Sequence, residues 1–228
     1  MIASFRKHMA ESPEYARFVP FFAFLVLTFL GGMAGNDWKF WFYAGKIIAG
    51  AWLVWEMRKV VSEMRWAFSW EAVVVGVLIF IVWVGLDPYY PMIEILFKNT
   101  EESIWNPFAR FGDGSLTAWV LIVIRIFGMT IIVPPLEEVF YRSFAYRYII
   151  RYDFQKVALN YFDGVAFVMV ALVFGFVHPQ WLAGIICGMA YQWLVLRKNR
   201  LGDAMTAHAI TNFLLGVYVV WKGEWRFF

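Results

Sequence analysis

Long apolar runs joined by short polar connections dominate the chain. Phe18–Gly35 contains no charged side chain, and Ala204–Trp221 contains no Asp, Glu, Lys, Arg or His except His208. Runs of this length approach the roughly 18–20 apolar residues that cross a bilayer as a helix. The alternation of polar and apolar positions that is typical of membrane β-strands does not occur. The pattern therefore predicts an all-α, polytopic transmembrane bundle of about seven to eight helices.

The boundaries of the elements follow from the apolar runs and from the turn residues between them. We expect helices over residues 18–35, 38–58, 68–86, 116–133, 136–150, 163–178, 180–197 and 203–221. The break after 133 is placed at Pro134-Pro135, because proline lacks a backbone donor and tends to end the preceding helix.

The chain is expected to form one membrane domain over residues 1–228, because it shows no internal repeat and no low-complexity linker. The polar N-terminal segment, Met1–Arg17, is long, and the apolar run that follows it is longer than the hydrophobic region of a typical signal peptide. We therefore interpret that run as a retained first helix.

Composition supports a membrane location. The chain is 62% hydrophobic and only 16% charged, whereas soluble domains are about 45–50% apolar. Many of the 13 tryptophans flank apolar runs, as in the aromatic belts of membrane interfaces. The net charge of +3 and the lack of a basic, aromatic-rich patch argue against nucleic acid as a partner. The single cysteine excludes an internal disulfide.

Charge asymmetry between connections predicts the sidedness. The N-terminus and the connections at 58–66 and 197–202 are basic, whereas 87–115 is net acidic. The positive-inside rule therefore puts the first three in the cytoplasm and 87–115 outside. Arg151 and Lys156 also favour the inside, which requires residues 116–150 to cross only once. We expect a multi-pass protein of a bacterial inner membrane.

Three charged side chains interrupt this apolar sequence within "PPLEEVFYR" (residues 134–142). An ionisable group at mid-membrane costs about 2.5–3.5 kcal/mol on insertion scales. Glu138 and Arg142 are four residues apart and can form an ion pair on one helix face. Glu137 lies about 100° around the helix from Glu138 and is free to point elsewhere. Low dielectric and a second carboxylate suit Glu137 for a role as general acid or base.

Two of the three histidines also lie in apolar segments. His178 ends one such segment, and His208 shares a helix face with Asn212. The set allows two chemistries. Glu137, His178 and His208 could bind Zn²⁺ that activates water. Alternatively, Glu137 takes a proton from water with the help of a histidine, while His208 and Asn212 donate to the developing oxyanion.

One shared site requires an unusual turn. If residues 163–178 and 180–197 each crossed the whole membrane, His178 would lie near one membrane face and His208 near the other. Residues 163–178 make a helix of only about 24 Å, shorter than the roughly 30 Å hydrocarbon core. We therefore expect the His178-Pro179-Gln180 turn to lie within the bilayer. The idea of one site fails if the imidazoles are more than about 12 Å apart, a generous limit beside hydrogen-bond reach.

Two further charges within the expected helices have no assigned role. Lys46 lies eight residues into its helix and can extend to an interface. Arg125 can pair with a carboxylate or contact the terminus of a substrate. The sequence does not choose between these interpretations.

The ordered motifs Glu-Glu-x-x-x-Arg (Glu137, Glu138, Arg142), Phe-x-x-x-His (Phe174, His178) and His-x-x-x-Asn (His208, Asn212) resemble a known family. This is the CaaX protease and bacteriocin-processing (CPBP) family, which includes the CAAX prenyl proteases. The resemblance covers about residues 116–218 as a catalytic core, and it leaves 1–115 as N-terminal spans with an acidic extramembrane loop.

The resemblance implies an intramembrane endopeptidase that acts on a membrane-associated or lipid-modified peptide or protein. Glu137 would activate water, Glu138 would pair with Arg142, and Asn212 would donate to the oxyanion. His178 and His208 would be catalytic or metal-binding, and the motifs do not decide whether Zn²⁺ takes part. Buried charges are also compatible with a proton- or ion-coupled transporter, or with a catalytically silent scaffold or immunity protein.

Overall fold

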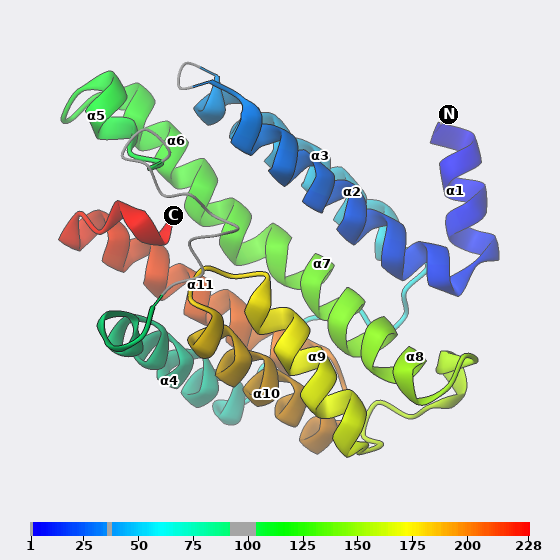
Figure 1. Cartoon of the computed structure of the whole chain (residues 1–228). Coiled ribbons are helices and arrows are strands. Elements are labelled where there is room, and N and C mark those ends of the chain that lie inside the picture. Colours follow the sequence, from blue (N-terminus) through cyan, green and yellow to red (C-terminus); the bar gives the residue numbers. More distant parts are fainter. Residues whose placement is uncertain (1, 36–37, 92–103) are drawn as a thin grey trace.

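The computed structural model describes residues 2–35, 38–91 and 104–228, and every regular element in that part of the chain is helical. Figure 1 shows their arrangement. The N-terminal half contains α1 (Ile2–Glu11), α2 (Pro13–Met33), α3 (Lys39–Met57), α4 (Trp70–Leu86) and α5 (Pro107–Phe111). The C-terminal half contains α6 (Leu116–Phe127), α7 (Val133–Glu138), α8 (Tyr146–Ile150), α9 (Gly164–Phe176), α10 (Trp181–Lys198) and α11 (Gly202–Lys222). Short 3₁₀ turns lie at Asp87–Tyr89, Phe154–Lys156 and Trp225–Phe227.

The expectation of a helical membrane bundle is confirmed. Four helical segments are long and apolar enough to cross a bilayer: Pro13–Met33, Trp70–Tyr89, Leu116–Ile150 and Gly202–Lys222. The shorter α9 is also apolar. Sequence reasoning missed α1 and α5, which lie in segments that were interpreted as polar. It also began α2 five residues late, because Ser12 caps the helix and Pro13 starts it.

The predicted break at Pro134-Pro135 is wrong. Residues 116–150 form one helical run of 35 residues. The π-helical turn η3 (Gly128–Ile132) precedes the prolines, and a second one, η4 (Val139–Ala145), follows them. In η3 the Val133 N–H donates to the Gly128 carbonyl, five residues back. A locally wider helix accommodates proline rings that would clash with carbonyls in a regular α-helix, so the chain continues without a break.

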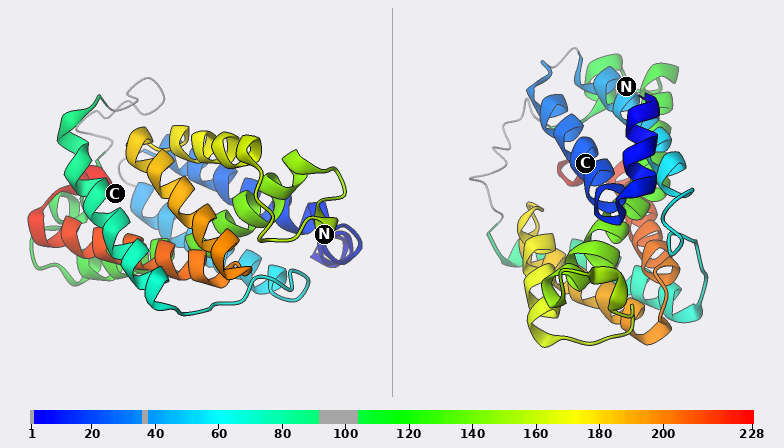
Figure 2. Two further views of the ribbon diagram at one scale, coloured as in Figure 1. Left: turned by 90° about the horizontal axis from the view of Figure 1, so that it is seen from below. Right: turned by 90° about the vertical axis from the view of Figure 1, so that its right-hand side faces the viewer.

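This long helical run separates two groups of helices. α2 and α3 pair with each other on one side of it, and α4, α9, α10 and α11 lie on the other side (Figures 1 and 2). α11 contacts both α4 and the middle of the long run. The centre of the long run is therefore the position where side chains from both groups can meet.

One end of the bundle carries the basic connections, and we call it the basic end. Glu63, in the connection after α3, pairs there with Arg17 of α2 at 2.8 Å and with Arg147 near the end of the long run at 3.0 Å. Lys198 of α10 pairs with Glu71 of α4 at 2.7 Å. These contacts gather the N-terminus and residues 58–71, 147–163 and 197–202 at that end.

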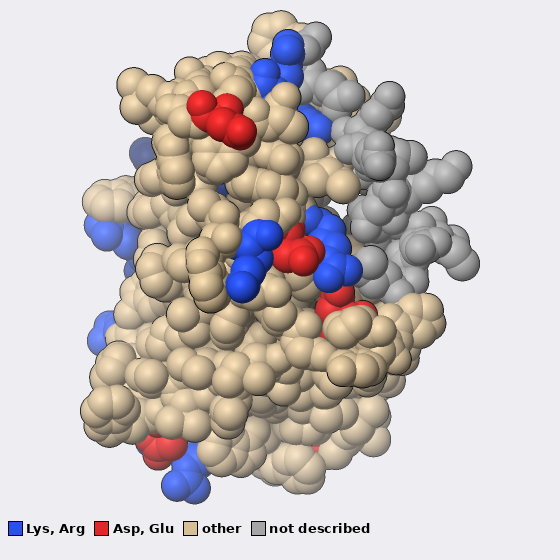
Figure 3. All heavy atoms as spheres, turned by 90° about the vertical axis from the view of Figure 1, so that its left-hand side faces the viewer, with Lys and Arg blue, Asp and Glu red and all other residues tan. Residues whose placement is uncertain are grey.

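Residues 87–91 and 225–228 lie towards the opposite end. Arg226 pairs there with Asp87 at 2.8 Å, and the Trp181 indole N–H donates to the Pro91 carbonyl at 3.0 Å. The face in Figure 3 carries few charged side chains on an otherwise uncharged surface. Residues 116–150 form one continuous helical run, so the sidedness expected from the basic connections requires only one crossing there. Most of the acidic loop, residues 92–103, lies outside the described part of the chain.

The connection between α9 and α10 follows a short helix, and its depth within a bilayer stays a prediction. α9 has only 13 residues, about 20 Å of helix, against a hydrocarbon core of about 30 Å. In Figure 1 this connection ends beside the middle of the long run. Glycines let the two helices approach closely: a Cβ on Gly184 would lie 2.9 Å from the Cα of Gly175. Close contact between small residues is a common basis of helix packing in membranes.

Candidate active site

Glu138 is the centre of a buried charge cluster at the middle of the long run. Its side chain is fully buried, and so is that of Arg142, one turn later. The Arg142 Nε atom lies 3.1 Å from Oε2 of Glu138, which is the ion pair that the four-residue spacing predicts. On the other carboxylate oxygen, Oε1 accepts a hydrogen bond from Nδ1 of His208 at 2.9 Å. The carboxylate therefore links α11 to the long run.

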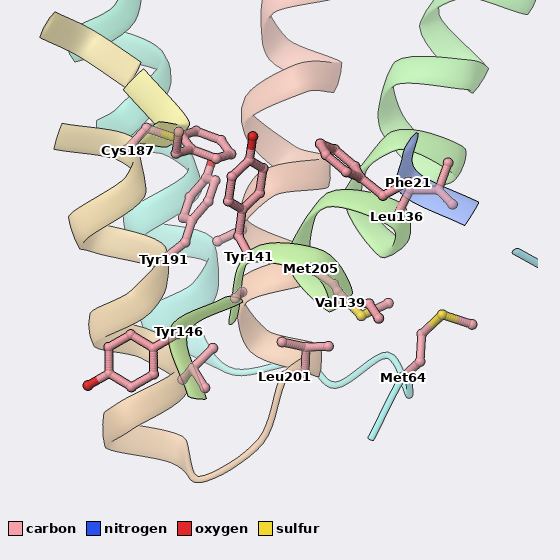
Figure 4. Packing of buried hydrophobic residues seen from close by; sticks show 14 of the residues in the cluster. Phe21, Met64, Leu136, Val139, Tyr141, Tyr146, Cys187, Tyr191, Leu201 and Met205 are labelled. Atoms are coloured by element: carbon pink, nitrogen blue, oxygen red, sulfur yellow. The ribbon is translucent and has the colours of Figure 1, made fainter. Parts of the chain in front are cut away.

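Aromatic rings surround the Arg142 guanidinium. Its central carbon lies 4.5 Å from the centre of the Phe174 ring and 5.4 Å from that of Tyr141. Tyr191 stacks on the His208 imidazole, with the ring centres 5.2 Å apart. In Figure 4, Tyr141 and Tyr191 lie next to each other between the long run and α10. These contacts shield the cluster from lipid and stabilise the cation through the faces of the rings.

Glu137 does not join this cluster. Its side chain lines a cavity of about 230 Å³ that is also lined by His178, His208 and Asn212. The Oε2 atom of Glu137 is buried, and it has no hydrogen-bond partner in the described part of the chain. Buried polar atoms almost always have a partner, so an unsatisfied one commonly marks a functional position. The two adjacent carboxylates therefore differ sharply in environment.

The two histidines meet at this cavity, as one shared site requires. Phe174 lies between them, with its ring centre 4.9 Å from that of His178 and 6.2 Å from that of His208. Because both distances are measured from the Phe174 ring, their sum is an upper limit on the separation of the two imidazole centres. That limit is below the roughly 12 Å set for a single site. His178 Nδ1 is 2.7 Å from the Phe174 carbonyl, which fixes the hydrogen on Nδ1 and leaves Nε2 as the available acceptor.

Asn212 binds a backbone carbonyl that the proline pair leaves without its usual donor. Met129 would normally accept from the N–H of Val133, but that group donates to Gly128 instead. The next N–H along the chain would belong to Pro134, which has none. Asn212 Nδ2 replaces these donors with a 2.7 Å hydrogen bond to the Met129 carbonyl. The amide is thereby fixed at the cavity with its second N–H available.

The described residues do not form a preorganised set of ligands for zinc. Within the described part of the chain, no three His, Cys, Asp or Glu side chains are grouped closely enough to hold one metal ion. Each imidazole uses Nδ1 within the protein, which leaves only the two Nε2 atoms and the Glu137 carboxylate as candidate ligands. We therefore derive no step through a metal.

The sequence-predicted residues divide into two places. Glu137, His178, His208 and Asn212 line the cavity, and Glu138 and Arg142 lie directly behind it. Lys46 and Arg125 line a different cavity. Sequence reasoning missed several residues that line the candidate cavity, most of them apolar or aromatic: Trp83, Met129, Cys187, Tyr191, Thr211 and Arg226–Phe228. Only Thr211, a polar residue beside Asn212 in an apolar helix, offered a signal.

One comparison with known proteins bears on this arrangement. Residues 114–214 match the model of the family described as "Rce1-like: Type II CAAX prenyl endopeptidase Rce1-like", and the match contains all six predicted site residues. No curated protein and no solved structure matches the chain. Similarity to this family favours an intramembrane protease with a protein substrate. Over residues 114–214, somewhat less than half of its length, the chain is similar to the Rce1-like type II CAAX prenyl endopeptidases of the CPBP family.

Proposed function

We propose that this protein is a metal-independent intramembrane endopeptidase that cleaves a membrane-associated or lipid-modified peptide or protein. Glu137 acts as the general base, and His178, His208 and Asn212 assist it. The bacterial inner membrane is the proposed location. The observation that carries the proposal is the buried, unpartnered oxygen of Glu137 at the cavity that the other three side chains line.

The base acts through a water molecule. Glu137 Oε2 takes one proton from a water that enters the cavity, and His178 Nε2 accepts the other hydrogen as a hydrogen bond. The resulting hydroxide attacks the carbonyl carbon of the scissile peptide bond. The surrounding low dielectric strengthens both interactions, because few water dipoles compete for the carboxylate.

Two donors face the charge that develops on the carbonyl oxygen. Asn212 donates its second amide N–H while Nδ2 stays tied to Met129. When His208 carries both ring hydrogens, it donates from Nε2 and keeps its Nδ1 bond to Glu138. Collapse of the tetrahedral intermediate breaks the C–N bond, and the proton held by Glu137 passes to the departing amine. The products are a carboxylic acid and an amine, which become a carboxylate and an ammonium ion when the acid passes its proton to the amine, and Glu137 is restored.

The experiment uses purified protein in lipid nanodiscs. The probes are a quenched fluorescent peptide with an S-farnesyl cysteine followed by three apolar residues, and the same peptide without the lipid. Glu137→Gln keeps the size of the side chain but removes the base, so we expect cleavage to fall by at least about 10²-fold. Thermal unfolding of each variant shows whether the fold is intact.

Ser62→Ala is the matched control, because Ser62 lies in the exposed connection at the basic end, far from the cavity. Cleavage by Glu137→Gln at the wild-type rate would contradict the proposal. Loss of proton or ion flux in proteoliposomes with Glu137→Gln, without any proteolysis by the wild type, would favour a transporter. A change in stability alone would favour a silent scaffold.

A further inference from the structure

A series of hydroxyl hydrogen bonds joins three helices beside the candidate cavity. The side chain of Tyr191 in α10 is fully buried, and its hydroxyl donates to Oγ1 of Thr211 in α11 across 2.7 Å. The Thr211 hydroxyl in turn donates to the Gly76 carbonyl of α4 at 2.8 Å, and it lies 3.1 Å from the Ala207 carbonyl. Tyr191 and Thr211 both line the cavity. The proposed reaction uses neither of them.

A glycine brings α4 close enough for this series to form. A Cβ at position 76 would lie 2.7 Å from the Ala207 carbonyl oxygen and 2.8 Å from Cβ of Ile210, which is closer than side chains tolerate. Small residues bring membrane helices into backbone contact, and hydroxyl side chains then form hydrogen bonds between them. Because Thr211 reaches a backbone carbonyl of α4, the series fixes α4, α10 and α11 relative to one another at this point.

The ring of Tyr191 determines how the His208 imidazole lies. The two rings are stacked, with their centres 5.2 Å and their planes 28° apart. The hydrogen bond from Nδ1 to Glu138 fixes only one point of the imidazole, so the ring could still turn about that point. The face of Tyr191 and the ring of Phe174, which meets the imidazole at 79°, remove this freedom. The direction of the His208 Nε2 atom therefore depends on Tyr191.

Thr211 lies between the two proposed oxyanion donors of α11. It follows His208 by three residues and directly precedes Asn212, so all three lie within about one helical turn. A rotation of α11 would therefore move both donors together, and the bond from Thr211 to Gly76 opposes that rotation. Displacement of a catalytic group by about 1 Å can lower a rate by about 10²-fold. The hydroxyl series therefore acts on the geometry of both donors.

We infer that Tyr191 and Thr211 are positioning residues for the oxyanion donors. Tyr191 orients the imidazole of His208, and Thr211 holds both the Tyr191 ring and the rotation of α11, so that His208 and Asn212 face the same carbonyl oxygen. The inference rests on the proposed function. Because the two donors act on charge that develops in the transition state, a change at either positioning residue should lower kcat and leave KM nearly unchanged.

The kinetic test separates the ring of Tyr191 from its hydroxyl. With the farnesylated peptide in nanodiscs, Tyr191→Leu removes the ring and should lower kcat by at least about tenfold, with KM within about twofold of wild type. Tyr191→Phe keeps the ring and loses only the bond to Thr211, so its kcat should lie between those of wild type and Tyr191→Leu. Thermal unfolding is measured for every variant.

Tyr146→Phe is the matched control. Tyr146 is also fully buried, its hydroxyl donates to the Tyr161 carbonyl at 3.0 Å, and its side chain points away from Tyr191 in Figure 4. This variant should lose stability and keep the wild-type kcat. An equal fall of kcat in Tyr146→Phe and Tyr191→Phe would show that general loosening of the fold, and not the position of His208, sets the rate, and would overturn the inference.

A conservative pair at Thr211 tests the hydroxyl series and serves even if Tyr191→Leu does not fold. Thr211→Val keeps the shape of the side chain and removes the hydroxyl, whereas Thr211→Ser keeps the hydroxyl. Serine should therefore retain most of the wild-type kcat, and valine should lower kcat without a matching change in KM. Equal kcat values for the serine and valine variants would overturn the role of Thr211.

A spectroscopic arm needs no substrate and separates this inference from the proposed function. The chain has 3 histidines, so NMR of protein labelled only at histidine gives few ring signals, and His208→Gln identifies that of His208. A stacked aromatic ring shifts the resonances of the imidazole protons. Tyr191→Leu should therefore move the His208 signal, and Tyr146→Phe should leave it in place.

The outcomes of the two arms differ in what they overturn. A shifted His208 signal in Tyr191→Leu, with no cleavage by the wild type, would overturn the peptidase and keep the orientation of His208 by Tyr191. Cleavage by Tyr191→Leu at the wild-type kcat would overturn the inference and keep the peptidase. A rise in KM at constant kcat would assign Tyr191 to substrate binding and would also overturn the positioning role.

Discussion

His208 donates from Nδ1 to Oε1 of Glu138 across 2.9 Å, and this bond joins α11 to the middle of the long run. Arg142 occupies the other oxygen of the same carboxylate. Both oxygens of Glu138 therefore have a partner, Oε1 through a hydrogen bond and Oε2 through the ion pair alone, whereas Oε2 of Glu137 has neither kind of partner among the described residues. Adjacent residues of the same type thus have opposite environments, and the variants described below exploit this difference.

Replacement of Glu138 should damage the fold, and replacement of Glu137 should not. Glu138→Gln leaves the fully buried Arg142 without its counter-charge, and breaking such a pair costs about 3–5 kcal/mol. Glu137→Gln removes a charge with no partner to lose, so stability should stay equal or rise. Unfolding free energies measured in detergent would distinguish the two. Equal destabilisation by both changes would contradict the assigned roles.

Asn212→Ala should affect both catalysis and stability. The variant leaves the Met129 carbonyl without its donor, which costs about 1–3 kcal/mol. It also removes one donor to the oxyanion, which lowers kcat by about 10²–10³-fold. Because the lost interaction forms in the transition state, kcat should fall while KM changes little. An increase in KM at constant kcat would instead indicate a role in substrate binding.

Removal of metals tests the proposed mechanism directly. No three ligands are grouped for a metal among the described residues, so proteolysis should survive dialysis against EDTA and 1,10-phenanthroline with less than about a twofold change. Elemental analysis of the purified protein should find no stoichiometric zinc. Loss of activity that returns on addition of Zn²⁺ would overturn the metal-independent proposal and restore the alternative with Glu137, His178 and His208 as ligands.

Sequence reasoning found the parts of this site that depend on spacing along one helix. The Glu138–Arg142 pair follows from a separation of four residues, and the short α9 follows from the length of its apolar run. The partner of His208 could not be predicted, because spacing says nothing about which carboxylate a side chain on another helix reaches. Membrane helices of equal hydrophobicity can rotate or shift against one another, and only their packing fixes the pairing.

The proline pair shows why a local rule gave the wrong result. Pro134-Pro135 predicts a break from the missing N–H donors alone. The structure keeps the run continuous through the π-turn η3, and Asn212 from α11 binds the carbonyl that the prolines leave without a donor. A tertiary contact thus offsets a local defect. The cavity that Lys46 and Arg125 line was missed for a related reason, since these two residues come together only when α3 packs against α6.

Acid should weaken the charge network at the basic end. Burial raises the pKa of the Glu63 carboxyl, but the Arg17 charge and the hydrogen bond from the Ser143 hydroxyl outweigh this and hold the pKa below its ordinary value. A lowered pKa in the folded state stabilises the protein above the unfolded pKa of about 4.3. That stabilisation is lost as the pH falls through the lower folded value.

Glu63→Gln should therefore be less stable than wild type at pH 7, and the difference should narrow below about pH 4. Melting temperatures between pH 7 and pH 3 measure this. Glu11→Gln serves as the control, because Glu11 forms only an exposed pair with Lys7 at 3.8 Å and should change nothing. A constant difference between Glu63→Gln and wild type at every pH would exclude the titration of Glu63 as the cause.

The sidedness of the bundle determines which compartment supplies the substrate. We expect the mouth of the candidate cavity to lie near Gln180 and Arg226, which line it towards the end opposite the basic connections. The positive-inside rule makes that end the outer one. Single cysteines in a Cys187→Ala background test this. Asp113→Cys should react with a membrane-impermeant maleimide in intact cells, and Lys156→Cys only in inverted vesicles. The wild-type protein should not react in intact cells or in inverted vesicles, because its Cys187 is buried. The reverse pattern would place the mouth in the cytoplasm and require a cytoplasmic substrate.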